Sequence, residues 1–437
     1  MLRATVALVL AVLFASPCQA DLHDLMKTKG RKVLFLGDSN TYSGLYIGYV
    51  EGYLRTRFPE EPWDLINLGL PSETLSGLSE PDHPYPRPDV HERAERALTK
   101  IKPNIVFVCY GMNDGIYHPF SEDRLKKYKE GTEKLVAKIE KAGAKVILMT
   151  PAPFDGTPIA KNLLPKDSPK FSWMKPYEKY DAEVLRKYSD YLLEWRSKGY
   201  TVVDAHSAVH RFLKKMREVE PKYIVSGDGI HPNATGHTVI AFEILLELKA
   251  PADIEFAEID FAKVKVLKGS GKITEHGRDF LFIHLPGKLP MPMSSQWNKR
   301  LAAIEKHPET LNRHTFKVVG LPAGKYEIRH EMKIAGSPDV VEDQVLRLAT
   351  HAELADGVSF FIPSSSVAWS SRIGDSIALR HRVLGPAWLS EIGYQRPGTP
   401  KGRPLDEAIK QAEEIERDIH KLSPPRPFDI VIRKKGD

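Results

Sequence analysis

The sequence contains very little cysteine, with only Cys18 and Cys109 among its 437 residues. Because Cys18 lies in an N-terminal segment that we expect to be removed, a disulfide within one mature chain is excluded. Cys109 lies in the apolar run 105–110, where a single cysteine is typically a small buried core residue. Stability must therefore come from burial of apolar side chains, and the length of the chain predicts two or more domains.

Neither sign of charge dominates: the formal net charge is +6, and no basic tract or basic-aromatic ladder is present. This pattern argues against a nucleic-acid partner. The apolar run 4–15, which follows Arg3, is too short to span a bilayer, so we predict no stable membrane span. It is instead typical of a signal peptide over residues 1–20, cleaved after Ala20, with export to the periplasm or the cell exterior. A lipoprotein signal at Cys18 is an alternative that the preceding Ala-Ser-Pro fits poorly.

The stretch 33–41 organises the first half of the chain. Its four apolar residues, Val-Leu-Phe-Leu, predict a strand that is buried on both faces. The strand stops at Gly37-Asp38-Ser39-Asn40-Thr41, and a helical pattern follows from 45 to 58. This order leaves the Ser39 hydroxyl at the carboxyl end of a strand, where open α/β sheets place their active sites. Ser39 is therefore the candidate nucleophile.

Short apolar runs alternate with helical patterns as far as residue 250. The predicted strands cover 33–37, 64–68, 105–110, 145–150 and 201–204, and the predicted helices cover 45–58, 89–101, 122–142, 177–198, 207–219 and 235–248. Such alternation predicts an α/β fold of three layers, with a mostly parallel sheet between helices on both faces.

Three further polar turns follow the Gly37-Asp38-Ser39 turn: Asn67-Leu68-Gly69, Gly111-Met112-Asn113-Asp114 and Asp228-Gly229-Ile230-His231. In content and order, the four turns resemble the blocks of the SGNH hydrolases, also called GDSL-type esterases and lipases. The resemblance covers roughly residues 30–250. It implies a five-stranded flavodoxin-like fold and a serine ester hydrolase that needs no cofactor. Asn40 stands where many members carry leucine, isoleucine or valine, which leaves the shape of the pocket open.

The resemblance also implies roles for individual residues. Ser39 would attack the ester carbonyl, His231 would take and return its proton, and Asp228 would orient His231. The oxyanion donors would be the backbone N–H groups of Ser39 and Gly69 and the side-chain amide of Asn113. The Asp228–His231 segment could alternatively be a simple turn, and Asn67 only a turn former. We expect two more carboxylates, Asp38 and Asp114, to accept N–H bonds from nearby loops.

Other motifs carry less weight. A second Gly-Asp-Ser, at Ser376, has no clean strand before it and no Asp-x-x-His after it. His206 and His210 have the spacing of a helical metal pair, but Ser207 replaces the glutamate of zinc peptidases, so we predict packing or surface histidines and no metal. No Gly-x-Ser-x-Gly surrounds Ser39, which argues against an α/β-hydrolase.

The pattern of predicted strands and helices changes after residue 250. Candidate strands lie at 254–260, 262–267, 280–285, 315–319 and 326–331, and helical segments at 295–306, 349–355 and 405–422. We therefore divide the chain into a signal peptide (1–20), an SGNH domain (21–250) and a smaller β-rich accessory region with some helix (251–437). The segment 320–326 loosely resembles hairpins of accessory β-modules in secreted bacterial enzymes. A second half that binds polysaccharide or cell wall is a further possibility.

The sequence thus predicts a secreted serine esterase acting through an acyl-enzyme. The long connection 71–88 offers hydrogen-bonding side chains and one aromatic ring, from Ser72, Glu73, Asp82, His83, Tyr85 and Arg87. This favours a small-molecule or glycan ester, with acetyl as the acyl group. The connection could alternatively be an ordinary surface loop. A lysophospholipase or short-chain lipase, and a catalytically silent glycan-binding protein, are the alternatives. No signal indicates an oligomeric state.

Overall fold

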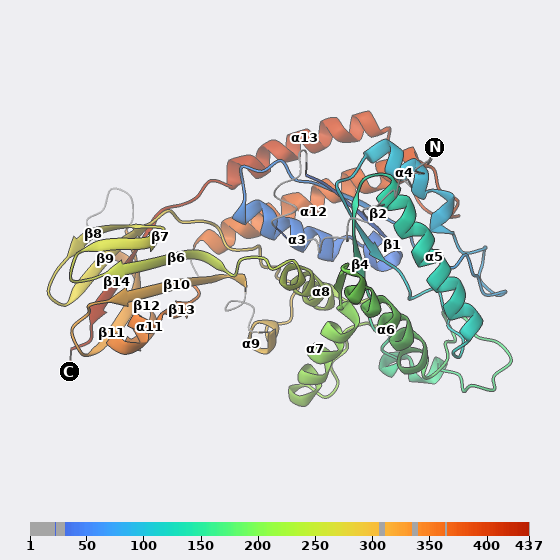
Figure 1. Cartoon of the computed structure of the whole chain (residues 1–437), viewed down its shortest axis with the longest axis horizontal. Helices are drawn as coiled ribbons and strands as arrows, with labels where there is room; N and C mark the ends of the chain where they lie inside the picture. Colours follow the sequence, from blue (N-terminus) through green and yellow to red (C-terminus); the bar gives the residue numbers. More distant parts are fainter. Residues whose placement is uncertain (1–21, 23–30, 306–310, 334–339, 363–364, 437) are drawn as a thin grey trace, which may run out of the picture.

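The computed structural model describes residues 22, 31–305, 311–333, 340–362 and 365–436. The predicted signal peptide, including Cys18, lies outside the described residues. Figure 1 shows an α/β part and, at the other end of the molecule, a β-rich part, with two long C-terminal helices lying along the α/β part.

The five predicted strands of the first half form one parallel sheet. They are β1 (Lys32–Gly37), β2 (Asp64–Gly69), β3 (Ile105–Cys109), β4 (Lys145–Met149) and β5 (Thr201–Val203). Their spatial order is β2-β1-β3-β4-β5, so the winding direction reverses between β1 and β3. Ligands bind outside the carboxyl ends of the strands at such a switch point. The residue that follows β1 there is Asp38, and Ser39 comes next.

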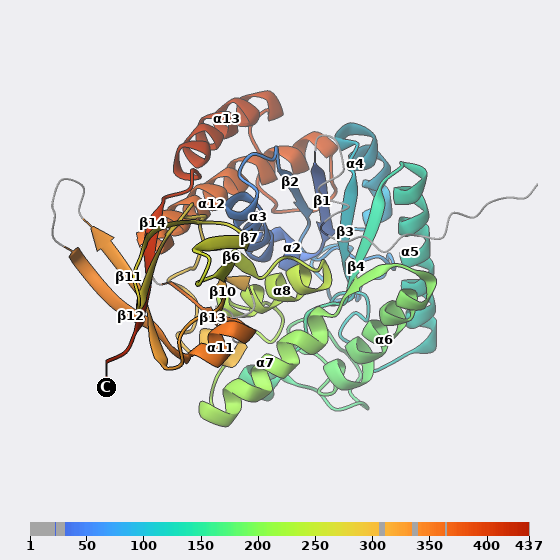
Figure 2. The same cartoon turned by 60° about the vertical axis from the view of Figure 1, so that its left-hand side comes forward.

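Six of the described helices cover the sheet: α3 (Leu45–Arg57), α4 (Ala94–Ile101), α5 (Glu122–Lys141), α6 (Arg186–Glu194), α7 (Ala205–Val219) and α8 (Ala234–Glu247). They enclose two separate cores, one on each face. Val33 and Phe35 belong to the core under α3, α7 and α8, whereas Leu34 and Leu36 belong to the core under α4, α5 and α6. Strands buried on both faces are apolar throughout, which is the pattern the sequence shows. Figure 2 shows the sheet between the two helix layers, which is the predicted SGNH (flavodoxin-like) fold.

Two of the predicted helices are less regular than expected. The segment 89–101 contains a short 3₁₀ turn, η1 (Val90–Glu92), before α4. The segment 177–198 begins with a π-helical turn, η3 (Tyr180–Leu185), before α6, and ends with the 3₁₀ turn η4 (Trp195–Lys198). A further 3₁₀ turn, η2 (Thr157–Asn162), follows β4.

Two sheets form the β-rich part. One has the order β13-β10-β6-β7 and the other β12-β11-β14-β9-β8. Their strands are β6 (Asp253–Asp260), β7 (Lys265–Gly269), β8 (Lys272–His276), β9 (Phe280–Leu285), β10 (Arg313–Val319), β11 (Lys325–Lys333), β12 (Val340–Thr350), β13 (Val358–Phe360) and β14 (Phe428–Lys434). Side chains from both sheets share one core, for example Phe316 of β10 with Ile283 of β9 and Ile430 of β14. The last described strand, β14, lies between β11 and β9 and is therefore an inner strand of the second sheet.

The C-terminal helices differ most from the prediction. The predicted helix 405–422 is α13 (Leu405–Leu422), and 349–355 corresponds to α11 (His351–Asp356), but 295–306 is helical only in α9 (Leu301–Glu305). The longest described helix, α12 (Ser365–Ile392), was not predicted. It contains Gly374, Gly385 and Pro386, which all disfavour a helix in isolation. Ser376 lies within α12, so the second Gly-Asp-Ser is part of a helix and not a strand-to-helix turn.

The helices α12 and α13 contact the α/β part of the molecule. Figure 1 shows them running back along α3 and β2. Arg380 of α12 bonds Asp64 of β2 at 3.0 Å, and Arg55 of α3 bonds Glu416 of α13. The division into 21–250 and 251–437 stays a prediction, and the contacts above join two helices of the second region to the α/β part. Among the described helices, none is both long enough and apolar enough to cross a membrane.

Candidate active site

Ser39, His231 and Asp228 lie in one line of hydrogen bonds. Ser39 is the first residue of α2 (Ser39–Tyr42), directly after β1. The Nε2 atom of His231 lies 2.7 Å from Ser39 Oγ, and its Nδ1 atom lies 2.6 Å from Asp228 Oδ2. The second oxygen of Asp228 accepts the N–H groups of Ile230 and His231, both at 2.9 Å. With Nδ1–H bound to Asp228, Nε2 is left as an acceptor for the Ser39 hydroxyl, as a general base requires.

The charges of this pair support each other. Burial alone raises the pKa of Asp228, but the hydrogen bonds from the His231 ring and from two backbone N–H groups outweigh it and hold the pKa below its usual range. Burial alone lowers the pKa of His231, but the hydrogen bond and charge of Asp228 raise it above the usual value. Asp228 therefore stabilises the imidazolium that forms when His231 takes a proton.

These shifts predict the pH dependence of the enzyme. Only neutral His231 can accept the Ser39 proton, so kcat/KM should fall as the pH drops through the raised pKa of His231. In Asp228→Asn the raising interaction is lost while burial remains, so the acidic limb should move to lower pH. A pH series of kcat/KM for both proteins measures this. An acidic limb that stays in place in the variant would assign it to another group, such as Asp38.

The end of β2 is joined closely to the nucleophile turn. Asn67 Nδ2 donates to Thr41 O at 2.9 Å, and Asn67 Oδ1 accepts the Gly69 N–H at 2.8 Å. A Cβ atom on Gly69 would lie 2.1 Å from Tyr42 N, so only glycine fits here. Since the Gly69 N–H is already bound to Asn67, its predicted role as an oxyanion donor requires that it share this hydrogen or exchange partners.

Asn113 lies buried after β3 with its amide held at both ends. Its Nδ2 donates to Glu73 O at 3.2 Å, and its Oδ1 accepts the Tyr117 hydroxyl at 2.9 Å. One amide hydrogen therefore remains for an oxyanion. Tyr117 is not among the residues predicted from the sequence. Its position depends on left-handed backbone at Ile116 (φ 45°) and Tyr117 (φ 59°), which no sequence motif indicates.

The two scaffolding carboxylates behave as predicted. Asp38 Oδ1 accepts the Asn40 N–H at 2.9 Å, and Asp114 Oδ1 accepts the N–H groups of Leu75 and Ser76, both at 2.8 Å. Burial raises the pKa of Asp38 to about 7 and that of Asp114 to about 6. Asp114 thus fixes the start of the connection 71–88 beside the switch point.

Asn40, where this chain departs from the family name, lies between the two catalytic turns. Its side chain is buried, and its Nδ2 atom lies 3.5 Å from the backbone oxygen of Ile230, which immediately precedes His231. A leucine or valine could not donate this bond. We infer that Asn40 helps to set the distance between Ser39 and His231.

The connection 71–88 exposes fewer polar side chains to solvent than its sequence indicates. Glu73 is buried in an ion pair with Arg93, and Arg87 is buried in an ion pair with Glu80 at 2.6 Å. Neither Glu73 nor Arg87 therefore offers a free side chain to a substrate, which corrects that part of the prediction. Asp82, His83 and Tyr85 remain partly or fully exposed.

The segment after α12 contacts this connection from outside. Arg396 donates to Pro71 O at 2.9 Å, and its guanidinium lies 5.5 Å from the centre of the Tyr85 ring. Because Pro71 follows Gly69 by two residues, the C-terminal region supports the rim of the candidate site. Nothing in the sequence indicates this contact.

Outside the candidate triad, the structure brings together a second group. His206 and His210 of α7 both face Asp181 of η3, and these three side chains could hold a metal ion. The sequence pattern points only to the two histidines, because Asp181 comes from a different element.

Residues 35–239 match the GDSL-like lipase/acylhydrolase family. All four turns that carry the family resemblance lie in this range, with Ser39 and His231 in contact. The segment 35–239 is therefore a GDSL-like lipase/acylhydrolase domain, and the protein carries an SGNH-type ester hydrolase.

Relatives of this SGNH hydrolase differ in how much of it they cover. An acetylxylan esterase of Geobacillus stearothermophilus is 23% identical over 240 residues, which are 50% of this chain and 94% of that protein. A solved structure described as a gut microbial diltiazem-metabolizing enzyme covers 96% of this chain and 98% of its own, with 17% identity and a TM-score of 0.61. An acetylxylan esterase structure from G. stearothermophilus covers 54% and 97%, with 21% identity and a TM-score of 0.36. The second match shows that the fold of the whole chain, including the β-rich part, occurs in another protein.

Proposed function

We propose that this protein is an exported serine esterase that removes acetyl groups from a carbohydrate or another polar alcohol. The observation that carries the serine mechanism is the unbroken line from Asp228 through His231 to Ser39 Oγ. Export rests on the apolar N-terminal sequence with its small residues before Asp21. The acetyl preference rests on the connection 71–88 and on the likeness to an acetylxylan esterase.

The proposed reaction has two steps. Ser39 Oγ attacks the acyl carbon while its proton moves to His231 Nε2, and the carbonyl oxygen takes up the negative charge near the Ser39 and Gly69 N–H groups and the Asn113 amide. Collapse of this intermediate releases the alcohol, which takes the proton from His231, and leaves an acetyl-serine. A water molecule, deprotonated by His231, then attacks the acetyl-serine. The bond between Ser39 Oγ and the acyl carbon breaks, His231 returns the proton to Ser39 Oγ, and acetate is released.

A series of p-nitrophenyl esters tests the acyl preference. A pocket that buries a long chain gains about 0.8 kcal/mol per methylene, so going from two to eight carbons would add roughly 5 kcal/mol, or three to four powers of ten in kcat/KM. We expect the opposite, with kcat/KM highest at two to four carbons and lower beyond. A steady rise to eight carbons would overturn the acetyl proposal.

One observation favours the lipase-like alternative. Trp173 and Met174 are exposed, at 39% and 56%, on the segment after η2. Lys170 of the same segment lies 3.6 Å from Asp82, so the segment adjoins the connection 71–88. Substituting both Trp173 and Met174 with serine should leave hydrolysis of the two-carbon ester within about threefold of the parent. A role of these side chains in lipid binding would show as a loss of rate on long-chain esters only.

We also propose that the β-rich part binds glycan. A pull-down of the whole protein on insoluble acetylated and deacetylated glycans tests this. The reading as a silent glycan-binding protein would require that a fluorophosphonate probe fails to label Ser39.

A further inference from the structure

The potential metal-ligand atoms of Asp181, His206 and His210 lie close together. His206 and His210 lie one turn apart on α7, so both rings leave the same face of the helix. The Nε2 atom of His206 lies 3.2 Å from Asp181 Oδ1, and the Nε2 atom of His210 lies 2.7 Å from Asp181 Oδ2. All three ligand atoms lie within 4.8 Å of one another. Two histidines thus share one carboxylate, whereas a simple histidine–carboxylate pair has only one histidine.

The group is held firmly on its inner side. The His206 side chain is 2% exposed, and the His206 N–H donates to Thr150 Oγ1 at 2.9 Å. Asp181 Oδ1 also accepts the Phe154 N–H at 2.7 Å. The first bond fixes the backbone of His206 and the second fixes the Asp181 side chain, and neither uses the Nε2 atom of His206 or the second carboxylate oxygen of Asp181. The site is thus largely formed before any ion binds.

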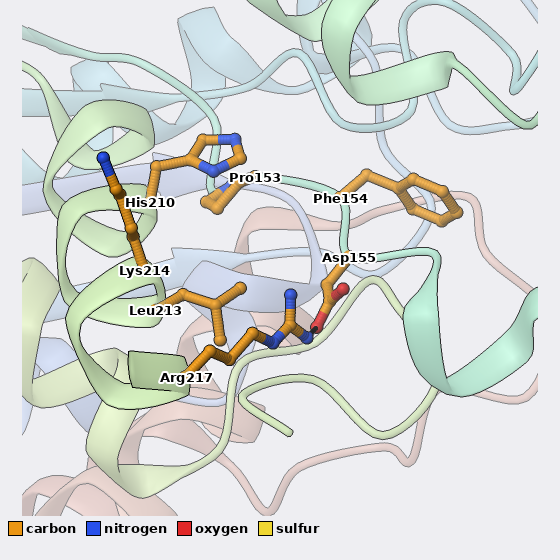
Figure 3. A pocket seen from close by; sticks show the side chains of 7 residues that line it. All are labelled: Pro153, Phe154, Asp155, His210, Leu213, Lys214 and Arg217. Carbon is orange, nitrogen blue, oxygen red and sulfur yellow. Dashed lines mark hydrogen bonds and ion pairs between the residues drawn. The ribbon is translucent and has the colours of Figure 1, made fainter. Parts of the chain in front are cut away.

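The outer side is open to an ion. The His210 side chain is 45% exposed and lines a cavity of about 170 Å³. Figure 3 shows His210 beside Pro153 at one end of this cavity and Arg217 paired with Asp155 at the other. The cavity makes His210, one of the three ligands, accessible from solvent, and the half-exposed His210 ring has freedom to adjust to an ion.

The donor set selects the kind of ion. Two imidazole nitrogens and one carboxylate oxygen are the three ligands of many zinc sites, in which water takes the fourth position. Ligand atoms on a tetrahedral Zn²⁺ lie roughly 3.3 Å apart, given bonds of about 2.0–2.1 Å. The His206–Asp181 contact already has nearly this length. Hard ions such as Ca²⁺ and Mg²⁺ prefer oxygen ligands and fit this set poorly.

We propose that Asp181, His206 and His210 bind one divalent first-row transition-metal ion, with Zn²⁺ as the ion that fits best. The ion has a structural role. Phe154 N–H bonds Asp181, and the next residue, Asp155, donates its N–H to Gly229 O at 2.9 Å. Gly229 belongs to the turn that carries Asp228 and His231. The ion would therefore tie η3 and α7 to the segment that supports the catalytic turn.

The experiment compares Zn²⁺ binding by the whole protein and by two histidine variants. Protein stripped with EDTA and dialysed is titrated with Zn²⁺ by calorimetry, and its thermal unfolding is followed with and without Zn²⁺. His210→Ala removes a half-exposed ligand. His284→Ala is the matched control, because His284 is 46% exposed and pairs with a carboxylate, Asp429, at 2.9 Å, but belongs to no such three-residue group among the described residues.

We expect the parent and His284→Ala to bind one Zn²⁺ and to gain about 3 °C or more in Tm at a hundredfold excess over Kd. His210→Ala should bind at least about 100-fold more weakly, since even a change around a metal ligand costs about 10–100-fold. Far-UV circular dichroism checks that the variant is folded. Should it fail to fold, Co²⁺ added to the stripped parent gives a second test, since a tetrahedral site produces intense visible absorption.

Three results would overturn the proposal: no saturable Zn²⁺ binding by the stripped parent, equal binding by His210→Ala and the parent, or no visible band with Co²⁺. The structural role predicts that stripped enzyme still hydrolyses p-nitrophenyl acetate at room temperature while its Tm falls. Loss of activity that Zn²⁺ restores, at unchanged Tm, would contradict that role. Since binding and Tm are read without ester hydrolysis, these results do not depend on the proposed function.

Discussion

Ser39→Ala and His231→Ala are each expected to lower kcat by roughly 10⁴-fold or more, and the double variant should be little worse than either. The reason is that the two side chains act as one unit: Ser39 Oγ can attack only when His231 Nε2, 2.7 Å away, takes its proton. Once one member is gone, the other has nothing left to contribute. Measurement of kcat for the three variants on p-nitrophenyl acetate tests this, and multiplicative losses in the double variant would contradict the assignment.

Ser376→Ala provides the control for this experiment. Ser376 follows the same Gly-Asp pair as Ser39 but lies within α12. We expect this variant to keep its activity and to be labelled by a fluorophosphonate probe as the parent is, whereas Ser39→Ala should not be labelled. Labelling of Ser39→Ala at the parent level would place the nucleophile elsewhere.

Asn113→Ala should lower kcat by about 10²–10³-fold, with a much smaller change in KM. The amide can form its strongest bond only when the carbonyl oxygen has become an oxyanion, so its loss affects the transition state more than the bound ester. The remaining contacts of Asn113, to Glu73 O and the Tyr117 hydroxyl, keep the amide in place before the substrate arrives. A change confined to KM would instead assign Asn113 to substrate binding.

Tyr117→Phe separates orientation from direct donation. The variant keeps the ring, which stacks on Tyr180 at 5.0 Å, and loses only the bond to Asn113 Oδ1. A hydrogen bond of this kind is worth about 1 kcal/mol, so kcat should fall by about tenfold or less. In the Asn113→Ala background the same change should have little effect. An unchanged tenfold loss in that background would mean that Tyr117 acts independently of Asn113.

The sequence by itself determined the sheet and the nucleophile turn. Val33, Leu34, Phe35 and Leu36 are all apolar because both faces of β1 are covered, and a strand of this kind can be recognised from its own residues. The roles of Asp38 and Asp114 as N–H acceptors could also be predicted, since carboxylates in tight turns bond nearby backbone groups. The same holds for α13, whose apolar residues recur with helical spacing.

Only the tertiary structure decided the place of α12. Its glycines and proline weaken any local helical signal, and its stability comes from partners far away in the sequence. Arg380 of α12 reaches Asp64, and His381 lies 2.7 Å from the buried Glu51. Burial alone would raise the pKa of Glu51, but Arg55 and His381 hold it below its usual range. Such a charge cluster forms only when α12, α3 and β2 have packed together.

The same reason explains what the sequence could not show at the two candidate sites. Glu73 and Arg87 looked available to a substrate, yet Glu73 is buried in an ion pair with Arg93, and Arg87 in one with Glu80 of the same connection. Asp181 meets His206 and His210 because η3 packs against α7, and no spacing along the chain encodes that contact. Local pattern determined which residues can carry chemistry here, whereas packing between distant segments decided which of them are free to do so.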